Sequence, residues 1–288
     1  MGYDYNMMKR DAEYLARNFP EASLYSIGES VMEHKIYCIE AGTGSKKLFV
    51  NGAHHGLEYL TSAFLMRFLR EYFTAVKNHE EMFGYDPSAL FRRTTLYTVP
   101  MVNPDGVDIA IHGIDITNPY HRHLISMVGI HSFHRVWQAN ANGVDINHNY
   151  NAGWRVVRKK PSPSQYSGPY SESEPETQAV VSFVREQKFD MLLAFHSQGG
   201  EIYYDYDGKM SEKAEELAAR FSKVSGYRPA KPEGDAAFGG CKDWFIQEFG
   251  KSGFTIEVGH GQNPLPMELL DQIYQENAPI LLCALENA

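Results

Sequence analysis

The stretch "KLFVNGAHHGLEYLTSAFLMRFLREYFTAV", residues 47–76, decides the fold because it contains a strand, a turn and a helix in succession. Residues 48–53 form a short apolar run that ends near a glycine, which is typical of a buried strand. Residues 61–76 repeat apolar side chains at helical spacing. His54, His55 and Glu58 lie between the two parts. The stretch therefore predicts a strand-to-helix turn that contains two imidazoles and a carboxylate.

Strand and helix patterns alternate along the rest of the chain. Apolar runs predict strands at residues 35–40, 94–100, 189–195, 201–206 and 254–258. Helical spacing predicts helices at residues 7–19, 173–187, 211–224 and 242–249, and a closing helical stretch interrupted at Pro279. Ser173 and Glu176 predict a capping box. Residues 35–40 and 48–53, joined by "GTGSKK", predict a two-stranded hairpin.

Strands separated by helices predict an α/β fold with three layers, in which helices cover both faces of a mixed, mostly parallel twisted sheet. The chain has 288 residues, 43% of them hydrophobic, so we expect residues 1–288 to form a single domain around one core. The regular pattern fades between Asn103 and Tyr170. A loop region of this length inside a compact domain is usually functional.

Charge and cysteine content narrow the class of protein. A formal net charge of −9 argues against nucleic-acid binding, which needs a concentrated basic face. The three cysteines are widely spaced and form no Cys-x-x-Cys pattern, which indicates reduced thiols. The start "MGYDYNMMKRDAEYL" has no basic-then-apolar signal, and no apolar run is long enough for a membrane span. We therefore expect a cytoplasmic protein with no membrane partner. The oligomeric state cannot be predicted from these features.

Three of the predicted strands end close to a histidine or a glutamate. His55 and Glu58 follow residues 48–53. His196 directly follows residues 189–195, and Glu257 lies near the end of residues 254–258. Open α/β sheets place their sites at the carboxyl ends of the strands. Two histidines and one carboxylate with an open fourth position are the usual ligands of a catalytic zinc ion. Glu257 is then left to act as the base on a metal-activated water.

Each residue taken alone has a structural explanation. His55 and Glu58 could mark a polar loop-to-helix junction, His196 could be a core histidine, and Glu257 could be half of a buried ion pair. A carboxylate among Phe, Ile and Val is costly unless it is paired, metal-bound or protonated. The four residues together favour the zinc site.

Five motifs occur in an order that resembles zinc metallocarboxypeptidases of the carboxypeptidase A type. They are "HHGLE" (54–58), "VPMVNPDGV" (99–107), "NGVDINHNY" (142–150), "LLAFHSQGG" (192–200) and "KDWFIQEFGKSGFTIEVGHG" (242–261). The chain is most similar to the bacterial γ-D-glutamyl-meso-diaminopimelate peptidases of this superfamily, which cut peptidoglycan stem peptides. The resemblance implies a carboxypeptidase-like fold and a zinc peptidase that acts on a muropeptide or short peptide.

The resemblance also implies roles for individual residues. Zinc would be held by His55, Glu58 and His196, with Glu257 as general base and acid. Asp145 would accept a hydrogen bond from the His55 ring and fix its tautomer. His54 should point away from the metal.

Four positions depart from the family pattern. The family's Asn-Arg-Asn reads Asn147-His148-Asn149, and His148 cannot grip a terminal carboxylate as an arginine does. Endopeptidase cleavage is therefore favoured over carboxyl-terminal trimming. Gln138 replaces the arginine that stabilises the oxyanion, and Arg122, Arg135 or Arg155 could substitute for it.

The other two departures concern the pocket beyond the cleaved bond. Asp235 lies near the position of the family's mobile-loop tyrosine. Lys242 occupies the position that sets side-chain preference, where a cation suits the side-chain carboxylate of diaminopimelate. Alternatively, Lys242 is a solvated loop lysine.

The sequence leaves several functions open. A zinc carboxypeptidase or an N-acyl amino acid deacylase on the same fold is the main alternative, although both would need a carboxylate-gripping arginine. A non-catalytic binding module would be expected to have lost a ligand or the base. A serine hydrolase is disfavoured because the sequence contains no Gly-x-Ser-x-Gly motif. A cysteine nucleophile is disfavoured because Cys241 has no local partner for nucleophilic catalysis.

Overall fold

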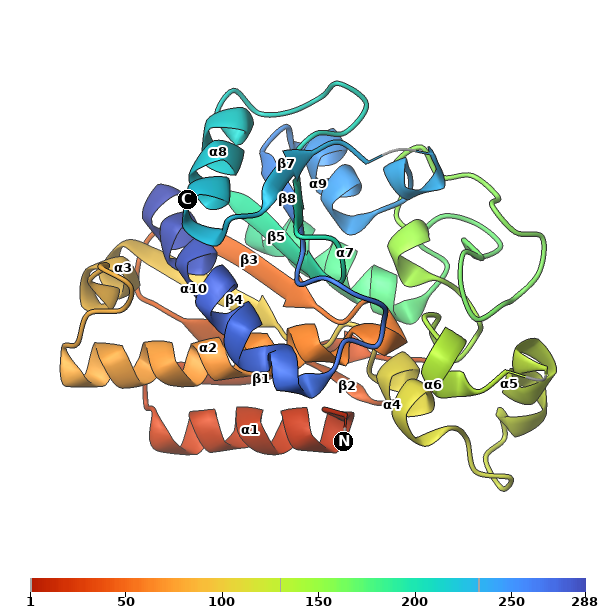
Figure 1. The fold of residues 1–288 in the computed structure, drawn as a ribbon. Coiled ribbons are helices and arrows are strands. Elements are labelled where there is room, and N and C mark those ends of the chain that lie inside the picture. Colours follow the sequence, from red (N-terminus) through yellow and green to blue (C-terminus); the bar gives the residue numbers. More distant parts are fainter. Residues whose placement is uncertain (1, 130, 233) are drawn as a thin grey trace.

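The computed structural model describes residues 2–129, 131–232 and 234–288, without the side chains of Asp235 and Ala236. Eight strands form one sheet in the order β1-β2-β4-β3-β5-β8-β6-β7 (Figure 1). The strand bounds are β1 Ala22–Glu29, β2 Lys35–Ala41, β3 Lys46–Gly52, β4 Thr94–Val99, β5 Met191–His196, β6 Glu201–Tyr203, β7 Arg228–Ala230 and β8 Ser252–Glu257.

The four central strands, β4, β3, β5 and β8, run parallel to one another. The outer strands are mixed, because β2 pairs antiparallel with β1 and β4, and β6 pairs antiparallel with β8 but parallel with β7. The predicted mixed, mostly parallel α/β sheet is therefore confirmed. All four central strands end at the same edge, where parallel sheets place their functional groups.

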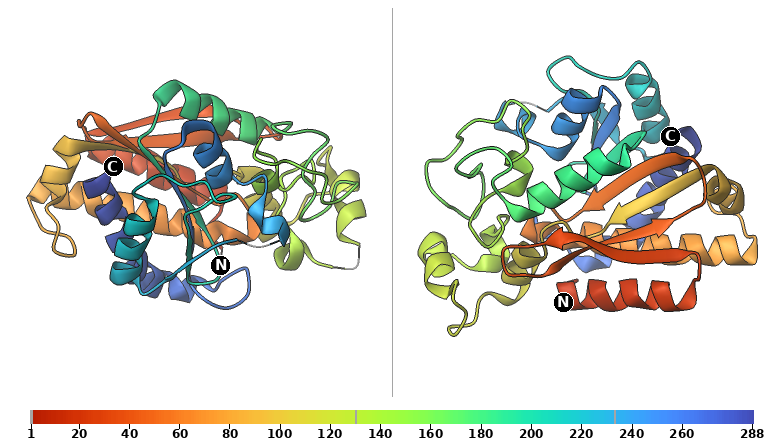
Figure 2. Two further views of the ribbon diagram at one scale, coloured as in Figure 1. Left: turned by 90° about the horizontal axis from the view of Figure 1, so that it is seen from above. Right: turned by 180° about the vertical axis from the view of Figure 1, so that it is seen from behind.

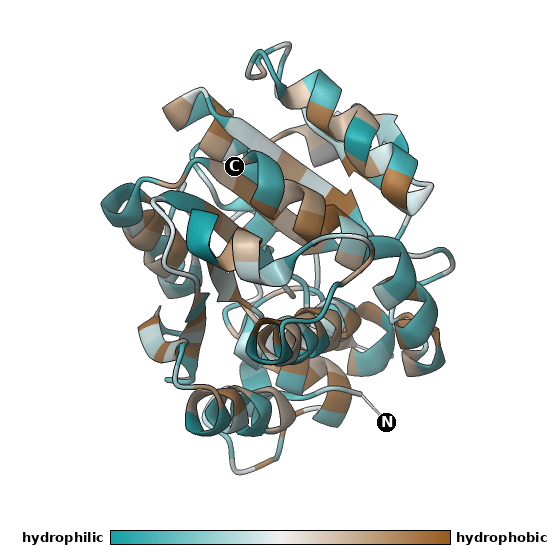
Figure 3. Cartoon of the chain, turned by 90° about the vertical axis from the view of Figure 1, so that its left-hand side faces the viewer, coloured by the Kyte–Doolittle hydropathy of each residue, from teal (hydrophilic) through white to brown (hydrophobic). Residues whose placement is uncertain are grey.

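Helices cover both faces of this sheet. One face is covered by α1 (Tyr5–Asn18), α2 (Tyr59–Asn78), α8 (Ala214–Ser225) and α10 (Leu270–Asn287), and the other by α7 (Pro175–Gln187) and α9 (Cys241–Phe249) (Figure 2). Alternate residues of β3 pack into different cores: Leu48 and Val50 face the first set of helices, and Phe49 faces the second. The helices of the first face carry hydrophobic bands beside hydrophilic ones (Figure 3), as expected when one side of a helix is buried.

Three sequence-based expectations about these elements are wrong. The predicted hairpin does not form, because β4 lies between β2 and β3. The connecting loop crosses the start of β4, where the Thr43 N–H donates to the Phe91 carbonyl. The closing helix α10 continues through Pro279, which is buried. Ser173 does not cap α7, since the N-cap residue is Glu174 and Ser173 donates to its carboxylate.

The region between Asn103 and Tyr170 is more regular than expected. It contains α4 (Pro104–His112), α5 (His121–Val128), α6 (Phe133–Val136) and the 3-10 turn η2 (Ile146–His148). The remaining elements are α3 (Pro87–Arg93) and the 3-10 turns η1 (Gly56–Glu58), η3 (Gly234–Ala237) and η4 (Met267–Leu269). Within the described ranges, no helix is long and apolar enough to cross a membrane.

Candidate active site

The predicted metal ligands come together at the carboxyl edge of the central strands. His196 is the last residue of β5, Glu58 ends the 3-10 turn η1 that follows β3, and His55 directly precedes this turn. Nδ1 of His55 is 2.8 Å from Oε1 of Glu58, and Nδ1 of His196 is 2.9 Å from Oε2 of the same carboxylate. One ligand atom from each of the three residues lies within 4.8 Å of the others. The cluster predicted from the sequence is therefore present.

Asp145 contacts the opposite side of the His55 ring. Its Oδ1 is 3.1 Å from Nε2 of His55, and its Oδ2 accepts a hydrogen bond from the backbone N–H of Gln165. A carboxylate can only accept, so Nε2 of His55 carries a proton and the neutral ring has a lone pair on Nδ1. The contact has the geometry that the sequence implied for Asp145.

The charges of this cluster fit a zinc ion. Nδ1 of the neutral His55 ring and Oε1 of Glu58 are both acceptors, so a proton or a metal cation must lie between them. Burial lowers the pKa of His55, but the Glu58 and Asp145 carboxylates outweigh burial and hold this pKa well above its usual value. The site therefore attracts positive charge, and two imidazoles with one carboxylate are zinc ligands. Nε2 of His196 is buried and has no hydrogen-bond partner among the described residues, which suits a ring held at Nδ1.

Glu257 lies beside this cluster on the neighbouring strand. It ends β8 and is the register partner of His196. Its carboxylate makes no hydrogen bond with any described residue and is half-buried. Burial raises the pKa of Glu257 well above its usual value, and the nearby Glu58 carboxylate raises it further. An unpaired carboxylate next to a cation site has the chemistry of a proton acceptor.

His54 does not belong to the cluster, as the strand alternation predicts. Nε2 of His54 contacts the Tyr150 hydroxyl at 3.0 Å, and its ring is buried. The next residue but one, Gly56, has a packing role. A Cβ on Gly56 would lie 2.2 Å from the carbonyl oxygen of Gly106 and 2.8 Å from that of Trp137. Any side chain at residue 56 would therefore push the ligand turn out of place.

Asn147 and His148 lie in the turn η2, directly after Asp145. Together with Phe238, which contacts His148, they form what we call the wall of the site. Oδ1 of Asn147 accepts the backbone N–H of Cys241, so its NH2 group faces away from that bond and has no described partner. Nδ1 of His148 is 3.1 Å from the carbonyl oxygen of Phe238. The carbonyl can only accept, so Nδ1 carries the proton and Nε2 of the neutral ring is an acceptor. His148 thus lacks the forked pair of donors that an arginine has.

Gln138 lies against the ligand turn through its main chain. Its carbonyl accepts the Gly56 N–H, and its side chain makes no hydrogen bond with a described residue. Among the three candidate arginines, only Arg155 contacts this wall. Its guanidinium lies over the Phe238 ring, 3.8 Å from the centroid, whereas Arg122 and Arg135 are exposed on or beside α5 and α6.

Lys242 is not a solvated loop lysine. It lies in the first turn of α9, and only 3% of it is exposed. Its Nζ pairs with Oδ1 of Asp243 and donates to the carbonyl of Asp205 at 2.5 Å. Lys242 is therefore a buried, paired cation.

Other residues around the site carried no signal in the sequence. The side-chain amide of Asn263 donates to the Ser197 carbonyl at 2.6 Å and lies 3.4 Å from Oε1 of Glu58. Asn140 donates to the carboxylates of Glu174 and Glu176, and its Oδ1 accepts the N–H of Val144 just before Asp145. These contacts link distant segments, so no local pattern marks them.

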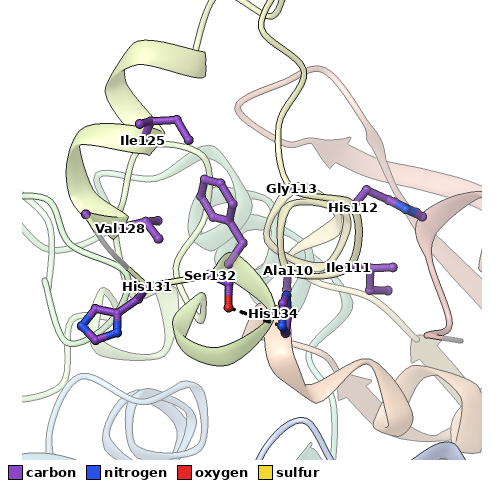
Figure 4. Close-up of a pocket in the computed structure, with 11 residues that line it drawn as sticks. Ala110, Ile111, His112, Gly113, Ile125, Val128, His131, Ser132 and His134 are labelled. Carbon is purple, nitrogen blue, oxygen red and sulfur yellow. Dashed lines mark hydrogen bonds between the residues drawn. The ribbon is translucent and has the colours of Figure 1, made fainter.

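A separate shallow pocket of about 290 Å³ lies between α4 and the α5–α6 segment (Figure 4). His112, His131 and His134 lie around it, and none of the predicted site residues lines it. Within residues 2–129, 131–232 and 234–288, His55, Glu58 and His196 are the one group of three or more His, Cys, Asp or Glu side chains that could hold a metal ion. The histidines of this pocket do not form a second such group.

Comparisons with known proteins agree with this geometry. Residues 8–280 match the family model of the zinc carboxypeptidases. The chain is 36% identical over 287 residues to the γ-D-glutamyl-L-diamino acid endopeptidase 1 of Lysinibacillus sphaericus, covering 98% of this chain and 72% of that protein. It is 27% identical over 252 residues to carboxypeptidase B of Rattus norvegicus, covering 81% of this chain and 57% of that protein.

Solved structures share the fold at lower identity. Thrombin-activatable fibrinolysis inhibitor superposes with a TM-score of 0.80 at 19% identity, covering 100% of this chain and 74% of that chain. The murein-tripeptide amidase MpaA of Escherichia coli O157 superposes with a TM-score of 0.60 at 20% identity, covering 90% and 91% of the two chains. Family match, fold and the His55–Glu58–His196 cluster agree, and the chain belongs to the zinc carboxypeptidase family of metallopeptidases.

Proposed function

We propose that this zinc metallopeptidase hydrolyses the γ-D-glutamyl bond to diaminopimelate, or to another L-diamino acid, in peptidoglycan stem peptides. The observation that carries the proposal is the 36% identity, over 98% of this chain, to a protein named as a γ-D-glutamyl-L-diamino acid endopeptidase. The substrate would be a muropeptide or a short peptide. A cytoplasmic location and a single domain over residues 1–288 remain predictions from the sequence.

The catalytic roles follow from the positions of the site residues. Zinc held by His55, Glu58 and His196 would supply a Lewis acid that polarises a carbonyl and lowers the pKa of water. The Glu257 carboxylate has no hydrogen-bond partner among the described residues, so it can accept a proton from the attacking water and pass it to the leaving amine. Asp145 keeps the proton of His55 on Nε2 and thereby leaves Nδ1 for the metal.

The wall residues favour an internal cleavage site over a free carboxyl terminus. The neutral His148 ring offers an acceptor where an arginine would offer two charged donors. The free NH2 group of Asn147 can donate to a substrate carbonyl or carboxylate. Together they would bind a neutral peptide continuation better than a terminal carboxylate.

Arg155 is our candidate for the oxyanion-stabilising cation that Gln138 cannot supply. It stacks on Phe238, whose carbonyl binds His148, so its guanidinium lies at the same wall. Gln138 would contribute a neutral donor near the ligand turn. Lys242 is already paired with Asp243, so it would favour the side-chain carboxylate of diaminopimelate only through its remaining N–H donor.

A zinc carboxypeptidase is the second candidate, because carboxypeptidase B of Rattus norvegicus and several solved carboxypeptidases resemble this chain. One experiment separates the two functions. The purified protein is incubated with L-Ala-γ-D-Glu-diaminopimelate, with the same peptide extended by D-Ala, and with an ordinary peptide, each with and without a chelator. Mass spectrometry should show chelator-sensitive release of L-Ala-D-Glu and no trimming of the ordinary peptide. Removal of the ordinary peptide's carboxyl-terminal residue would favour the carboxypeptidase.

A further inference from the structure

A second group of charged side chains lies along the strand next to the proposed base. In the antiparallel pair of β6 and β8, Glu201 is the register partner of Glu257, and Tyr203 is the partner of Thr255. Register partners in such a pair lie on the same face of the sheet. Asp205 follows Tyr203 by two residues and is in contact with Lys242 of α9. A path therefore runs along β6 from the base toward Asp205.

Three buried charges meet at the end of this path. Lys242, Asp243 and Asp205 are 3%, 2% and 6% exposed, so all three are removed from water. Nζ of Lys242 pairs with the Asp243 carboxylate and reaches Asp205 only at its main-chain carbonyl. One buried cation thus faces two buried carboxylates, and it neutralises Asp243.

The carboxylate of Asp205 is left without a hydrogen-bond partner among the described residues. Its Oδ2 is fully buried and unbonded. The nearest cation, Nζ of Lys231, is 3.9 Å away on a side chain that is 61% exposed, which is too far for a hydrogen bond. A buried carboxylate in this state is costly unless a positive group joins it. Lys231 therefore forms an ion pair with Asp205 without a hydrogen bond, which leaves a donor position at this carboxylate for a cation from outside the chain.

The distance from the base suits the side chain of a diamino acid. Asp205 lies four residues beyond Glu201 and two beyond the end of β6, so the two are at most roughly 13 Å apart along the chain. From the carbonyl carbon under attack to the terminal amine of a diamino acid, seven bonds span about 9 Å when extended. The base itself lies about 3 Å from the water that it deprotonates. Together, the substrate length and the distance from the base to the water are close to the separation of Glu201 and Asp205.

We infer that Asp205 is a specificity-determining residue that binds the side-chain ammonium of the diamino acid on the leaving-group side of the cleaved bond. This inference rests on the proposed function and adds to it. Because Asp243 neutralises Lys242, the negative charge of Asp205 remains, and it complements the side-chain ammonium that diaminopimelate and lysine share. An apolar side chain has no ammonium and makes no such contact with Asp205.

The test uses three synthetic peptides, L-Ala-γ-D-Glu-X, in which X is meso-diaminopimelate, L-lysine or L-norleucine. For the zinc-loaded Asp205→Asn protein we expect kcat/KM to fall about 10- to 100-fold with diaminopimelate and with lysine, mainly through KM. The rate with norleucine should stay within about twofold, because that side chain carries no ammonium. Asp207→Asn is the matched control, since it removes the same charge from an exposed position two residues away.

The outcomes separate the inference from the proposed function. Equal losses on all three peptides, or no loss on any, would overturn the role of Asp205 while leaving the cleavage reaction in place. If the wild-type protein cleaved none of the three peptides, the proposed function would fail and take the inference with it. If Asp205→Asn did not fold, the wild-type protein would decide: we expect it to prefer lysine over norleucine by tenfold or more, and equal rates would overturn the inference.

Discussion

His196 and Glu257 are register partners at the ends of β5 and β8. The N–H of Val258 donates to the His196 carbonyl at 2.8 Å and extends this pairing past the strand ends. The proposed metal ligand and the proposed base therefore sit on two adjacent strands whose spacing is set by the backbone. Because the two side chains do not share a hydrogen bond, their functions can be removed one at a time.

Replacing Glu257 with glutamine should abolish turnover without releasing zinc. The amide cannot accept the proton of the attacking water, so we expect kcat to fall about 100- to 10,000-fold. Zinc content, measured by plasma mass spectrometry, should equal that of the wild type, because Glu257 is outside the ligand cluster. Glu58→Gln is the contrasting variant and should lose both zinc and activity. Activity of Glu257→Gln within tenfold of wild type would rule out the role of base.

Removing zinc with a chelator should inactivate the enzyme and lower its melting temperature. The ion offsets the carboxylates of Glu58 and Asp145, and a ligand that binds only the folded state stabilises it. Adding zinc back should restore both properties. Differential scanning fluorimetry with a zinc titration would measure the effect, with Glu58→Gln as the control that does not respond. A melting temperature independent of zinc in the wild type would contradict the site.

Replacing Asp145 with asparagine should weaken zinc binding without removing it. The carboxylate fixes the proton of His55 on Nε2, and an amide holds this tautomer less strongly. We expect the affinity for zinc to fall about 10- to 100-fold. Competition with a zinc-binding dye would measure the change. An unchanged affinity would show that Asp145 does not orient the ligand ring.

Replacing His148 with arginine should add carboxypeptidase activity. The guanidinium is always charged and can bind a carboxylate through two parallel hydrogen bonds, whereas the neutral His148 ring cannot. We expect the variant to trim an ordinary peptide at its carboxyl terminus, which the wild type should leave intact. Release of the terminal amino acid would be followed by mass spectrometry. If the wild type already trims that peptide, the interpretation of His148 is wrong.

The raised pKa of Glu176 should make the free energy of unfolding fall as the pH rises from about 4.5 to 8. Burial, with the nearby Asp105 carboxylate, raises the pKa of Glu176 to about 8 from its usual 4.5. Within this window the folded chain keeps a proton that the unfolded chain has lost, so the free energy of unfolding falls with pH by at most about 1.4 kcal/mol per unit.

Denaturant unfolding at several pH values tests this dependence. The variant Glu176→Gln should show a flatter profile, because glutamine keeps an acceptor for Asn140 but does not titrate. Glu186→Gln, an exposed change on the same helix, should follow the wild type. Parallel profiles for the wild type and Glu176→Gln would show that Glu176 does not carry the effect.

The sequence by itself determined the class of fold and the central cluster. Residues 47–76 specify a strand, a turn and a helix because periodicity and turn residues act over a few neighbouring positions. His55, Glu58, His196 and Glu257 could be found because each follows or ends an apolar strand, and parallel strands bring these ends to one edge.

Only the tertiary structure decided which strands pair and which charges remain unpaired. The local patterns of β2 and β3 are correct, but the pairing of both with β4 depends on contacts between distant segments. Pro279 lies within a helix although its local preference is to break one, because its environment is the packed core. The missing hydrogen bond at Oδ2 of Asp205 and the raised pKa of Glu176 have the same origin among the described residues. Burial and pairing are properties of the folded neighbourhood, and no short stretch of sequence contains them.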